Sequence, residues 1–306
     1  MIELRDVTKR YGAQTSVSDV SFTVADGAFC ALVGPSGSGK STTLRMINRL
    51  IEPSAGTIRI GGQDIAALAP ESLRRRIGYA IQSVGLFPHW TIADNIATVP
   101  RLLDWPEDRV RQRVAELLTL LQLDEAAVAG KYPHQLSGGQ QQRVGVARAL
   151  AADPELLLMD EPFGALDPIT RENLRTELKR IHRSTGKTIL FVTHDIDEAL
   201  QLADVIAVLR DGKLIQFGAP LELLTRPAND FVREFIGGSA IGLKLLALQR
   251  VGDRVRAEPA PGEPIAAETS LAEALSQMVL RRAARLPVRD AAGKPVGSIG
   301  LSDLVA

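Results

Sequence analysis

The apolar positions of the chain follow two different patterns. In three segments apolar residues alternate with polar ones, at 2–4, 22–24 and 56–62. Alternation predicts half-buried strands of an antiparallel sheet. In three later segments the apolar runs are continuous, at 156–159, 188–192 and 205–209. Continuous runs predict strands covered on both faces, as in a parallel sheet whose strands alternate with helices.

Helical spacing and turn residues extend this outline. One apolar stripe, at positions 110, 114, 117, 118 and 121, predicts a helix that Pro106 opens. Residues 210–213 predict a hairpin turn after the strand at 205–209.

The composition changes after Phe235. Glycines at 237 and 238 interrupt the chain, and the proline-rich segment 258–264 is typical of a loop. Helix-like and strand-like segments follow, at 271–279, 286–288 and 296–299. We therefore predict a large domain at 1–236, a linker at 237–264 and a small domain at 265–306.

Composition narrows the possible classes of protein. A chain of 306 residues with 45% hydrophobic and 24% charged residues is long enough for two domains, and it is not a disordered protein. Its 36 Lys and Arg residues balance 36 Asp and Glu residues, and neither predicted domain is strongly basic. This balance argues against a nucleic-acid-binding protein.

The chain has one cysteine and no long apolar segment. Cys30 lies in an apolar run, which predicts a buried thiol, and it has no second cysteine with which to form an internal disulfide. We expect a reducing compartment. A membrane span needs about 20 apolar residues and a secretory signal needs a basic start, and neither pattern is found.

The clearest chemical motif is the phosphate loop at 34–42. It consists of Gly34, Pro35, Ser36, Gly37, Ser38, Gly39, Lys40, Ser41 and Thr42. The motif fits GxxxxGK[ST] and follows a predicted strand at 28–33. In such a loop backbone N–H groups surround a triphosphate, Lys40 reaches the β- and γ-phosphates, and the Ser41 hydroxyl coordinates Mg²⁺. The strand before it and the helix-compatible run after it argue against an ordinary flexible loop.

Two carboxylates follow the apolar run at 156–159. Asp160 is the candidate for holding Mg²⁺ through water, and Glu161 for orienting and deprotonating an attacking water. Alone, such a pair is more often a helix cap. Beside a phosphate loop it favours nucleotide hydrolysis.

A second glycine-rich segment precedes a helix-like run at 141–151. It consists of Leu136, Ser137, Gly138, Gly139 and Gln140. Backbone N–H groups at a helix N-terminus form a phosphate-binding surface. By its chemistry alone, such a segment is more often a simple N-cap, here at Ser137.

Taken together, these motifs resemble the ATP-binding subunit of an ABC transporter. The motifs occur along this chain in the same order as in that family: the phosphate loop, Gln82, residues 136–140, Asp160 and Glu161, residues 165–167 and His194. The resemblance covers residues 1–236. It implies an α/β phosphate-loop NTPase of the ABC type, with a parallel-sheet core, an antiparallel β subdomain and a helical subdomain.

The resemblance also implies cofactors and a dimer. Two copies would enclose two ATP molecules, each held between the phosphate loop of one copy and residues 136–140 of the other. Lys40, Glu161 and His194 would be the catalytic groups, with His194 on the γ-phosphate. Asp167 would lie at the dimer seam.

Further roles follow from the same resemblance. Tyr11 would stack on adenine, and Gln82 would join Ser41 and Asp160 around Mg²⁺ and sense the membrane partner. Each has an ordinary alternative: Tyr11 as a surface aromatic, Gln82 as a loop amide and His194 as a hydrogen-bonded strand-end histidine.

Two segments, at 74–91 and 225–232, are similar to ATPases of osmoprotectant importers for glycine betaine, choline and related quaternary amines. This similarity implies an integral-membrane permease, a periplasmic or lipid-anchored substrate-binding protein and a place on the cytoplasmic face of the cell membrane. Phe87, Pro88 and Trp90 would contribute to the groove for the permease's coupling helix. Packing within the helical subdomain is the alternative for these three side chains.

The segment 265–306 resembles a single CBS motif, a small α/β unit that usually works in pairs. Its adenosyl-binding pattern Gly-x-x-Thr-x-x-Asp is incomplete, because Gly300 takes the threonine position while Asp303 remains. Arg281, Arg282 and Arg285 would either face anionic lipid or form a solvated helix face.

Other functions remain open on the sequence alone. The cargo of the importer could instead be methionine or another small solute. A soluble ABC ATPase acting on ribosomes or DNA and a phosphate-loop small-molecule kinase are alternatives from other classes. The former usually carries two ATPase units or a coiled-coil insertion, and the latter would lack residues 136–140.

Overall fold

The computed structural model describes residues 1–81, 85–164 and 166–304. The chain divides into two compact units, Met1–Pro220 and Leu221–Ala306. The predicted boundary near residue 237 falls inside the second unit, because α10 (Asp230–Ile236) and α11 (Ile241–Leu248) both contact the 3-10 turn η3 (Gly238–Ala240) between them.

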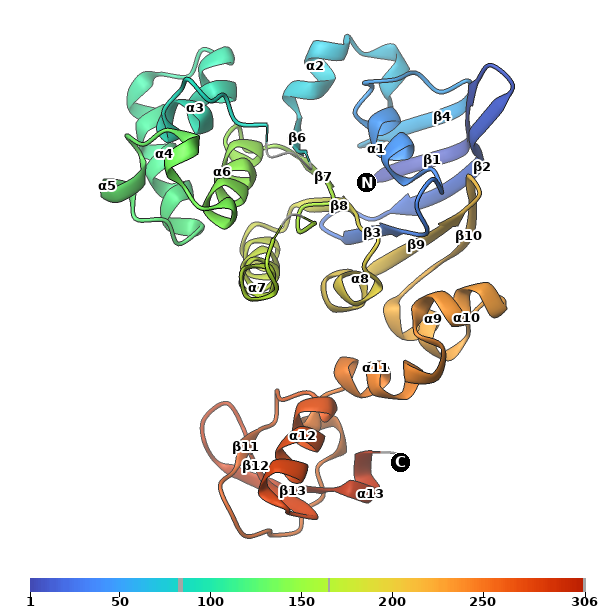
Figure 1. Ribbon diagram of the computed structural model, residues 1–306, viewed down its shortest axis with the longest axis vertical. Helices are drawn as coiled ribbons and strands as arrows, with labels where there is room; N and C mark the ends of the chain where they lie inside the picture. Colours follow the sequence, from blue (N-terminus) through green and yellow to red (C-terminus); the bar gives the residue numbers. More distant parts are fainter. Residues whose placement is uncertain (82–84, 165, 305–306) are drawn as a thin grey trace. The chain divides into compact units, whose positions relative to one another are not determined.

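The first unit contains an antiparallel sheet in the order β2-β1-β4-β5 (Figure 1). Its strands are β1 (Ile2–Tyr11), β2 (Gln14–Val24), β4 (Ala55–Ile60) and β5 (Gln63–Asp64). Leu4 pairs with Phe22 on β2 and with Ile58 on β4, and all three side chains are buried. The alternating apolar pattern is thus confirmed as one buried face of an antiparallel sheet.

A six-stranded sheet forms the centre of this unit, in the order β10-β9-β3-β8-β7-β6. Its strands are β3 (Phe29–Val33), β6 (Ile77–Ala80), β7 (Leu156–Asp160), β8 (Thr188–Val192), β9 (Val205–Arg210) and β10 (Lys213–Gly218). All pairs are parallel except the hairpin of β9 and β10. Every residue of β3, β7 and β8 is buried, including Cys30, as the continuous apolar runs predict.

Helix α1 (Lys40–Ile47) joins the two sheets in one core (Figure 1). Leu44 and Met46 of this helix share a buried apolar cluster with residues of both sheets. The short α2 (Pro70–Arg75) precedes β6, and α7 (Pro168–Thr185) and α8 (Ile196–Leu202) flank β8 along the chain. Since β3, β7 and β8 are parallel, the loops after their carboxyl ends meet at one edge of the sheet.

A helical group completes the first unit. Its elements are α3 (Ile92–Leu102), α4 (Glu107–Leu120), α5 (Glu125–Val128), η2 (Pro133–Gln135) and α6 (Gly138–Leu150). The predicted stripe of α4 is buried, and Pro106 is the residue before the helix, at the N-cap. Helix α6 begins three residues earlier than the sequence suggests, because Ser137 caps it.

The second unit has a sheet in the order β11-β12-β13. Its elements are α9 (Pro220–Thr225), α10, η3, α11, η4 (Val251–Arg254), β11 (Ile265–Ala266), α12 (Leu271–Arg281), β12 (Arg285–Arg289), β13 (Pro295–Gly300) and α13 (Leu301–Leu304). Val251 is fully buried in its core and α11 packs on α12. Much of the segment 237–264 is therefore part of a folded unit, unlike the linker that its glycines and prolines suggest.

Several charged residues of the second unit are paired with one another around Asp303. The buried carboxylate of Asp303 accepts a hydrogen bond from the Gly300 N–H at 2.8 Å and contacts the guanidinium groups of Arg256 and Arg285. Arg285 also lies 2.9 Å from Glu258. Asp303 is thus engaged inside its own unit. Arg285, one of the three arginines for which lipid contact and a solvated helix face are the alternatives, has internal partners.

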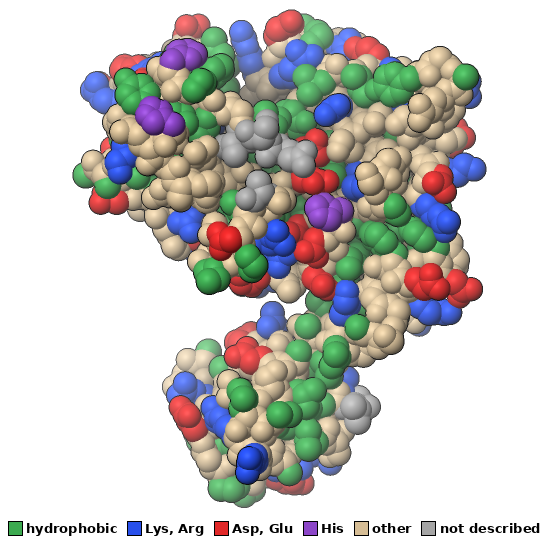
Figure 2. All heavy atoms as spheres, in the orientation of Figure 1, with side chains coloured by type: hydrophobic (Ala, Val, Ile, Leu, Met, Phe, Trp, Pro, Cys, Tyr) green, Lys and Arg blue, Asp and Glu red, His purple; other side chains and the backbone are tan. Residues whose placement is uncertain are grey.

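Figure 2 shows positive and negative side chains interspersed on the visible face of each unit. None of the helices in the described part of the chain combines the length and the apolar composition needed to cross a membrane.

Candidate nucleotide-hydrolysis site

The phosphate loop runs from the end of β3 into α1, as its motif predicts. Gly34 has a φ of +151°, and a Cβ built on it would lie 2.1 Å from the Leu209 carbonyl oxygen. Only glycine fits a backbone that is both left-handed and this close to a neighbouring strand. The conformation leaves the backbone of residues 36–39 lining a cavity at the N-terminus of α1.

Lys40 is the first residue of α1 and is buried. Its ammonium group donates hydrogen bonds to the carbonyl oxygens of Gly34 and Pro35, each at 2.8 Å. Burial lowers the pKa of Lys40, and the carboxylates of Glu161 and Asp160 oppose this shift. A cation is thus held inside the loop with little hydration, and a bound phosphate would supply a counter-charge.

Ser41 and Asp160 form the candidate magnesium site. The Ser41 hydroxyl donates to the Asp160 carboxylate at 2.9 Å, which joins α1 to the end of β7. Burial raises the pKa of Asp160, while the hydrogen bond from Ser41 and the charge of Arg45 oppose the shift. A hydroxyl and a carboxylate are hard oxygen ligands, so this pair fits Mg²⁺ bound together with phosphate oxygens. The described residues contain no cluster of three carboxylate, histidine or cysteine ligands.

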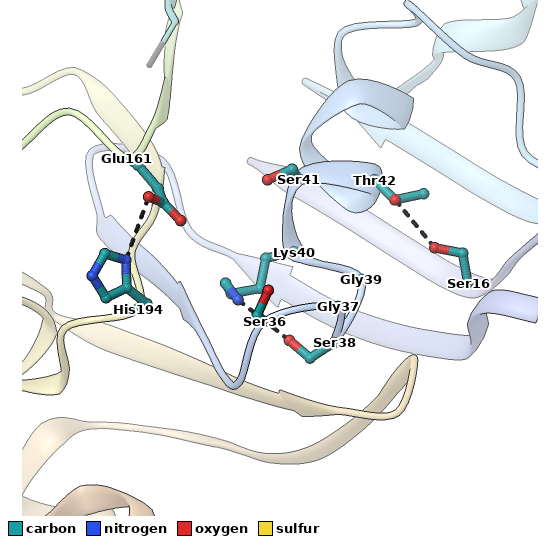
Figure 3. A pocket seen from close by; sticks show the side chains of 10 residues that line it. All are labelled: Ser16, Ser36, Gly37, Ser38, Gly39, Lys40, Ser41, Thr42, Glu161 and His194. Atoms are coloured by element: carbon teal, nitrogen blue, oxygen red, sulfur yellow. Dashed lines mark hydrogen bonds and ion pairs between the residues drawn. The ribbon is translucent and has the colours of Figure 1, made fainter. Parts of the chain in front are cut away.

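Glu161 and His194 face one another at the mouth of this cavity (Figure 3). The Oε2 atom of Glu161 lies 3.4 Å from Nδ1 of His194. Glu161 has a φ of +46°, and its N–H donates to the Val192 carbonyl oxygen at 3.0 Å. A non-glycine residue in this region costs about 1–3 kcal/mol and persists only where its surroundings hold it, typically at a functional site.

The cavity has a volume of about 280 Å³ and brings nine of the predicted residues together, seven from the phosphate loop and the pair Glu161 and His194. It is lined by Ser16, residues 36–42, Glu161 and His194. Ser16 was not predicted; its hydroxyl lies 3.2 Å from that of Thr42, and no sequence motif marks it. Tyr11 does not line the cavity: it is 51% exposed, with the Lys9 ammonium 5.0 Å from its ring centre. Gln82 and Ala165 lie outside the described residues.

Residues 136–140 are absent from the lining of this cavity in the described part of the chain. Ser137 caps α6 by accepting from the Gln140 N–H at 3.3 Å, and the Gln140 side chain accepts from the Ser137 N–H at 3.0 Å. The phosphate-binding surface predicted at residues 136–140 therefore requires a nucleotide that is not bound in this cavity.

Asp167 likewise begins a helix. Its carboxylate accepts from the N–H groups of Ile169 and Thr170, each at 3.1 Å, and hydrogen bonds from Thr170 lower the pKa of Asp167. A Cβ built on Gly139 would lie 2.3 Å from the Thr170 side chain, so the starts of α6 and α7 are adjacent. Ser137, Gly138, Asp167 and Ile169 are exposed, with Ile169 at 77%.

Comparison with known proteins identifies the family of this chain. The ABC transporter family model matches residues 17–164. The glycine betaine uptake system ATP-binding protein YehX of Escherichia coli K12 is 56% identical, over 100% of this chain and 99% of its own length. The chain belongs to the ATP-binding subunits of ABC transporters. As a member of this family, the chain is an ATPase, and its hydrolysis of ATP is coupled to transport.

Other relatives agree with this assignment. The glycine betaine/carnitine/choline transport ATP-binding protein OpuCA of Bacillus subtilis 168 is 49% identical, over 95% of this ABC subunit and 76% of its own length. The dimeric structure of the bacterial ABC transporter cassette MJ0796 has a TM-score of 0.65 and 37% identity, and covers 72% of this chain and 99% of its own. A second dimeric structure of that cassette, bound to ADP and Pi, is 36% identical with the same TM-score and coverage. The predicted family and the ABC-type fold are confirmed.

Proposed function

We propose that this ABC subunit hydrolyses ATP to drive the uptake of an osmoprotectant such as glycine betaine or choline through a separate permease. The observation that carries the proposal is the cavity in which the phosphate loop faces Glu161 and His194. The cargo class rests on the relatives, two of which are named for glycine betaine transport.

Within the cavity each side chain has a defined task. Lys40 and the loop N–H groups bind the β- and γ-phosphates. Ser41 and Asp160 would hold Mg²⁺, which neutralises phosphate charge when bound. Glu161 orients a water molecule and takes its proton, and His194 contacts the γ-phosphate beside it. Tyr11 and Gln82 remain predicted contacts to adenine and to the magnesium shell.

We further propose that two copies pair so that residues 136–140 of each cover the phosphate loop of the other. Three features support this arrangement. The N-terminus of α6 is exposed at Ser137 and Gly138, and a helix N-terminus is favourable for a phosphate. The exposed Asp167 and Ile169 extend the same surface. The cassette MJ0796, at 37% identity, is dimeric.

A groove on the helical group is the proposed site for the permease. It has a volume of about 570 Å³ and is lined by Phe87, Trp90, Asp94, Thr98, Arg101 and Leu102. The rings of Phe87 and Trp90 are 4.6 Å apart, and Arg101 lies 2.8 Å from Asp94. An apolar floor beside one ion pair suits an amphipathic helix. Pro88 is not part of the lining.

The permease would hold this subunit at the cytoplasmic face of the membrane, and a periplasmic or lipid-anchored protein would deliver the solute. The test is to copurify the subunit with its permease, reconstitute both in liposomes and compare the uptake of glycine betaine, choline and methionine. We expect ATP-dependent uptake of a quaternary amine that Glu161→Gln abolishes. Uptake of methionine alone would overturn the cargo assignment.

A further inference from the structure

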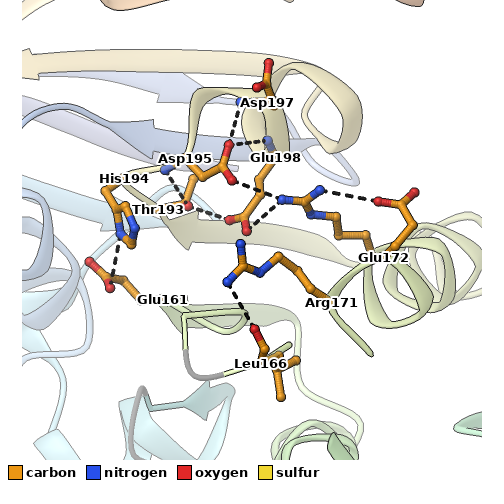
Figure 4. A network of polar contacts seen from close by, with 10 residues as sticks. Glu161, Leu166, Arg171, Glu172, Thr193, His194, Asp195, Asp197 and Glu198 are labelled. Atoms are coloured by element: carbon orange, nitrogen blue, oxygen red, sulfur yellow. Dashed lines mark hydrogen bonds and ion pairs between the residues drawn. The ribbon is translucent and has the colours of Figure 1, made fainter. Parts of the chain in front are cut away.

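His194 lies between Thr193 and Asp195, and hydrogen bonds link both of these residues to the buried carboxylate of Glu198. Glu198, on α8, is 4% exposed, and its Oε2 atom accepts from the Thr193 hydroxyl at 2.5 Å. The Thr193 hydroxyl oxygen in turn accepts from the Asp195 N–H at 3.0 Å. The backbone on both sides of His194 is thus tied to Glu198 (Figure 4).

The second oxygen of Glu198 is bound to another helix. Arg175, on α7, donates from Nη2 to Oε1 of Glu198 at 2.9 Å and to Oδ2 of Asp195 at 3.2 Å. The other oxygen of Asp195 caps α8 by accepting from the Asp197 N–H at 2.8 Å. Arg175 therefore joins α7 to the turn 193–195 through two carboxylates.

Because this network is buried, the positions of its side chains are tightly constrained. The side chains of Arg175 and Glu198 are 12% and 6% exposed, and Thr193 is 2% exposed. Charged groups withdrawn from water to this extent need their partners, and hydrogen bonds between them are short and directional. Loss of one partner leaves a buried charge or donor unsatisfied, so the turn cannot relax without a cost.

His194 itself has much weaker support. Its side chain is 64% exposed, and its contact with Glu161 is 3.4 Å long. An exposed imidazole at that distance is not held by the contact alone. Its position over the cavity is instead set by the backbone that carries it, and that backbone is fixed by Thr193 and Asp195.

We propose that Glu198 is a positioning residue for ATP hydrolysis, which acts through Thr193 and Asp195 to hold His194 against Glu161. Arg175 connects the same turn to α7, whose N-cap residue is Asp167, at the proposed dimer seam. The inference rests on the proposed function, and it adds a physical link between the seam and the group that contacts the γ-phosphate.

The test is a double-mutant cycle in the full chain. Glu198→Gln keeps the shape of the side chain and removes its charge, so kcat should fall by about 10- to 100-fold, the scale expected when a reacting group is displaced by about 1 Å. The KM for ATP should change by less than about twofold, because the phosphate loop is untouched. In a His194→Ala background, the same change should lower the single-turnover rate by less than about twofold.

Glu172→Gln is the matched control. Glu172 is an exposed carboxylate that contacts the same Arg175, at 3.4 Å, but does not reach the turn. Its loss should leave kcat unchanged. Equal, multiplicative losses from Glu198→Gln with and without His194 would overturn the inference.

A second pair of variants keeps the test decisive if Glu198→Gln does not fold. Thr193→Ser retains the hydroxyl and should keep kcat within about threefold, whereas Thr193→Val removes it and should reproduce the loss expected for Glu198→Gln. Equal activity of the two variants would overturn the inference. If instead the parental chain bound no ATP and hydrolysed none, the proposed function itself would fail.

Discussion

The Nδ1 atom of His194 lies 3.4 Å from the Oε2 atom of Glu161, at the mouth of the cavity formed by the phosphate loop. The two residues follow different strands, β8 and β7, and are brought together because these strands are parallel neighbours. One carboxylate that can accept a proton and one imidazole that can contact phosphate thus face the same space. This juxtaposition makes hydrolysis the chemistry that the cavity supports.

Glu161→Gln should lower the rate of ATP hydrolysis by about 10²- to 10⁴-fold, the usual contribution of a general base. The amide keeps the shape of the side chain but cannot take a proton from water. ATP affinity, measured with a fluorescent nucleotide, should change by less than about twofold. Glu155→Gln is the control, since Glu155 is an exposed carboxylate just before the opposite end of β7. Hydrolysis by Glu161→Gln at the parental rate would exclude it as the base.

The Mg²⁺ requirement of nucleotide binding should depend on pH through Asp160. Burial raises the pKa of Asp160, so its carboxyl takes up a proton at a higher pH than an ordinary aspartate. Because Mg²⁺ needs the ionised form, its apparent affinity should fall as the pH is lowered from neutral toward this raised pKa.

The check is a Mg²⁺ titration of fluorescent-nucleotide binding at several pH values. In Asp160→Asn the affinity for Mg²⁺ should be weaker throughout and should lack this pH dependence. An identical pH dependence in parent and variant would assign the titration to another group.

Substitutions at Ser137 separate its role as the N-cap of α6 from its proposed contact with the partner copy's nucleotide. Ser137→Asp should preserve the stability of α6, since Asp is as good an N-cap as Ser, whereas Ser137→Ala should cost about 1 kcal/mol in the free energy of unfolding. Hydrolysis should follow the opposite order, because a carboxylate repels the partner copy's nucleotide and a methyl group does not. Denaturation and ATPase measurements check both. If Ser137→Asp hydrolysed ATP as fast as the parent, Ser137 would be a cap alone.

Trp90 should be required for assembly with the permease. Trp90→Ala removes part of the apolar floor of the groove and should reduce copurification of the permease by about tenfold or more, as expected for a buried aromatic anchor. ATP binding by the isolated subunit should not change. Trp105→Ala is the matched control, because the other tryptophan of the chain stacks with Arg109 outside the groove. Equal losses in the two variants would argue against the groove.

The sequence predicts those parts of the site whose chemistry is local. The phosphate loop and the pair Asp160 and Glu161 are recognisable because each is a short motif at the end of an apolar strand. Ser16, Arg175 and Glu198 reach the site only through tertiary contacts, and their spacing in the sequence carries no signal. Such residues cannot be found before the strands are ordered in the sheet.

The glycine and proline residues at 237–264 did not predict the structure of the second unit correctly. They suggest a linker at 237–264, yet Val251 lies in the core of that unit and α11 packs on α12. A few buried contacts thus outweigh local breaker residues. Residues 136–140 cap a helix away from the cavity of their own chain, and their contact with the nucleotide of a second copy stays a prediction.

We propose that each ATP site combines the phosphate loop of one copy with residues 136–140 of another. The most direct measurement is to mix two inactive variants, Lys40→Ala and Ser137→Asp, and to assay ATP hydrolysis. In a mixed dimer one site carries both defects and the other carries neither, so random pairing should restore about one quarter of the parental rate. A mixture no more active than either variant alone, although mixed dimers form, would contradict the shared site.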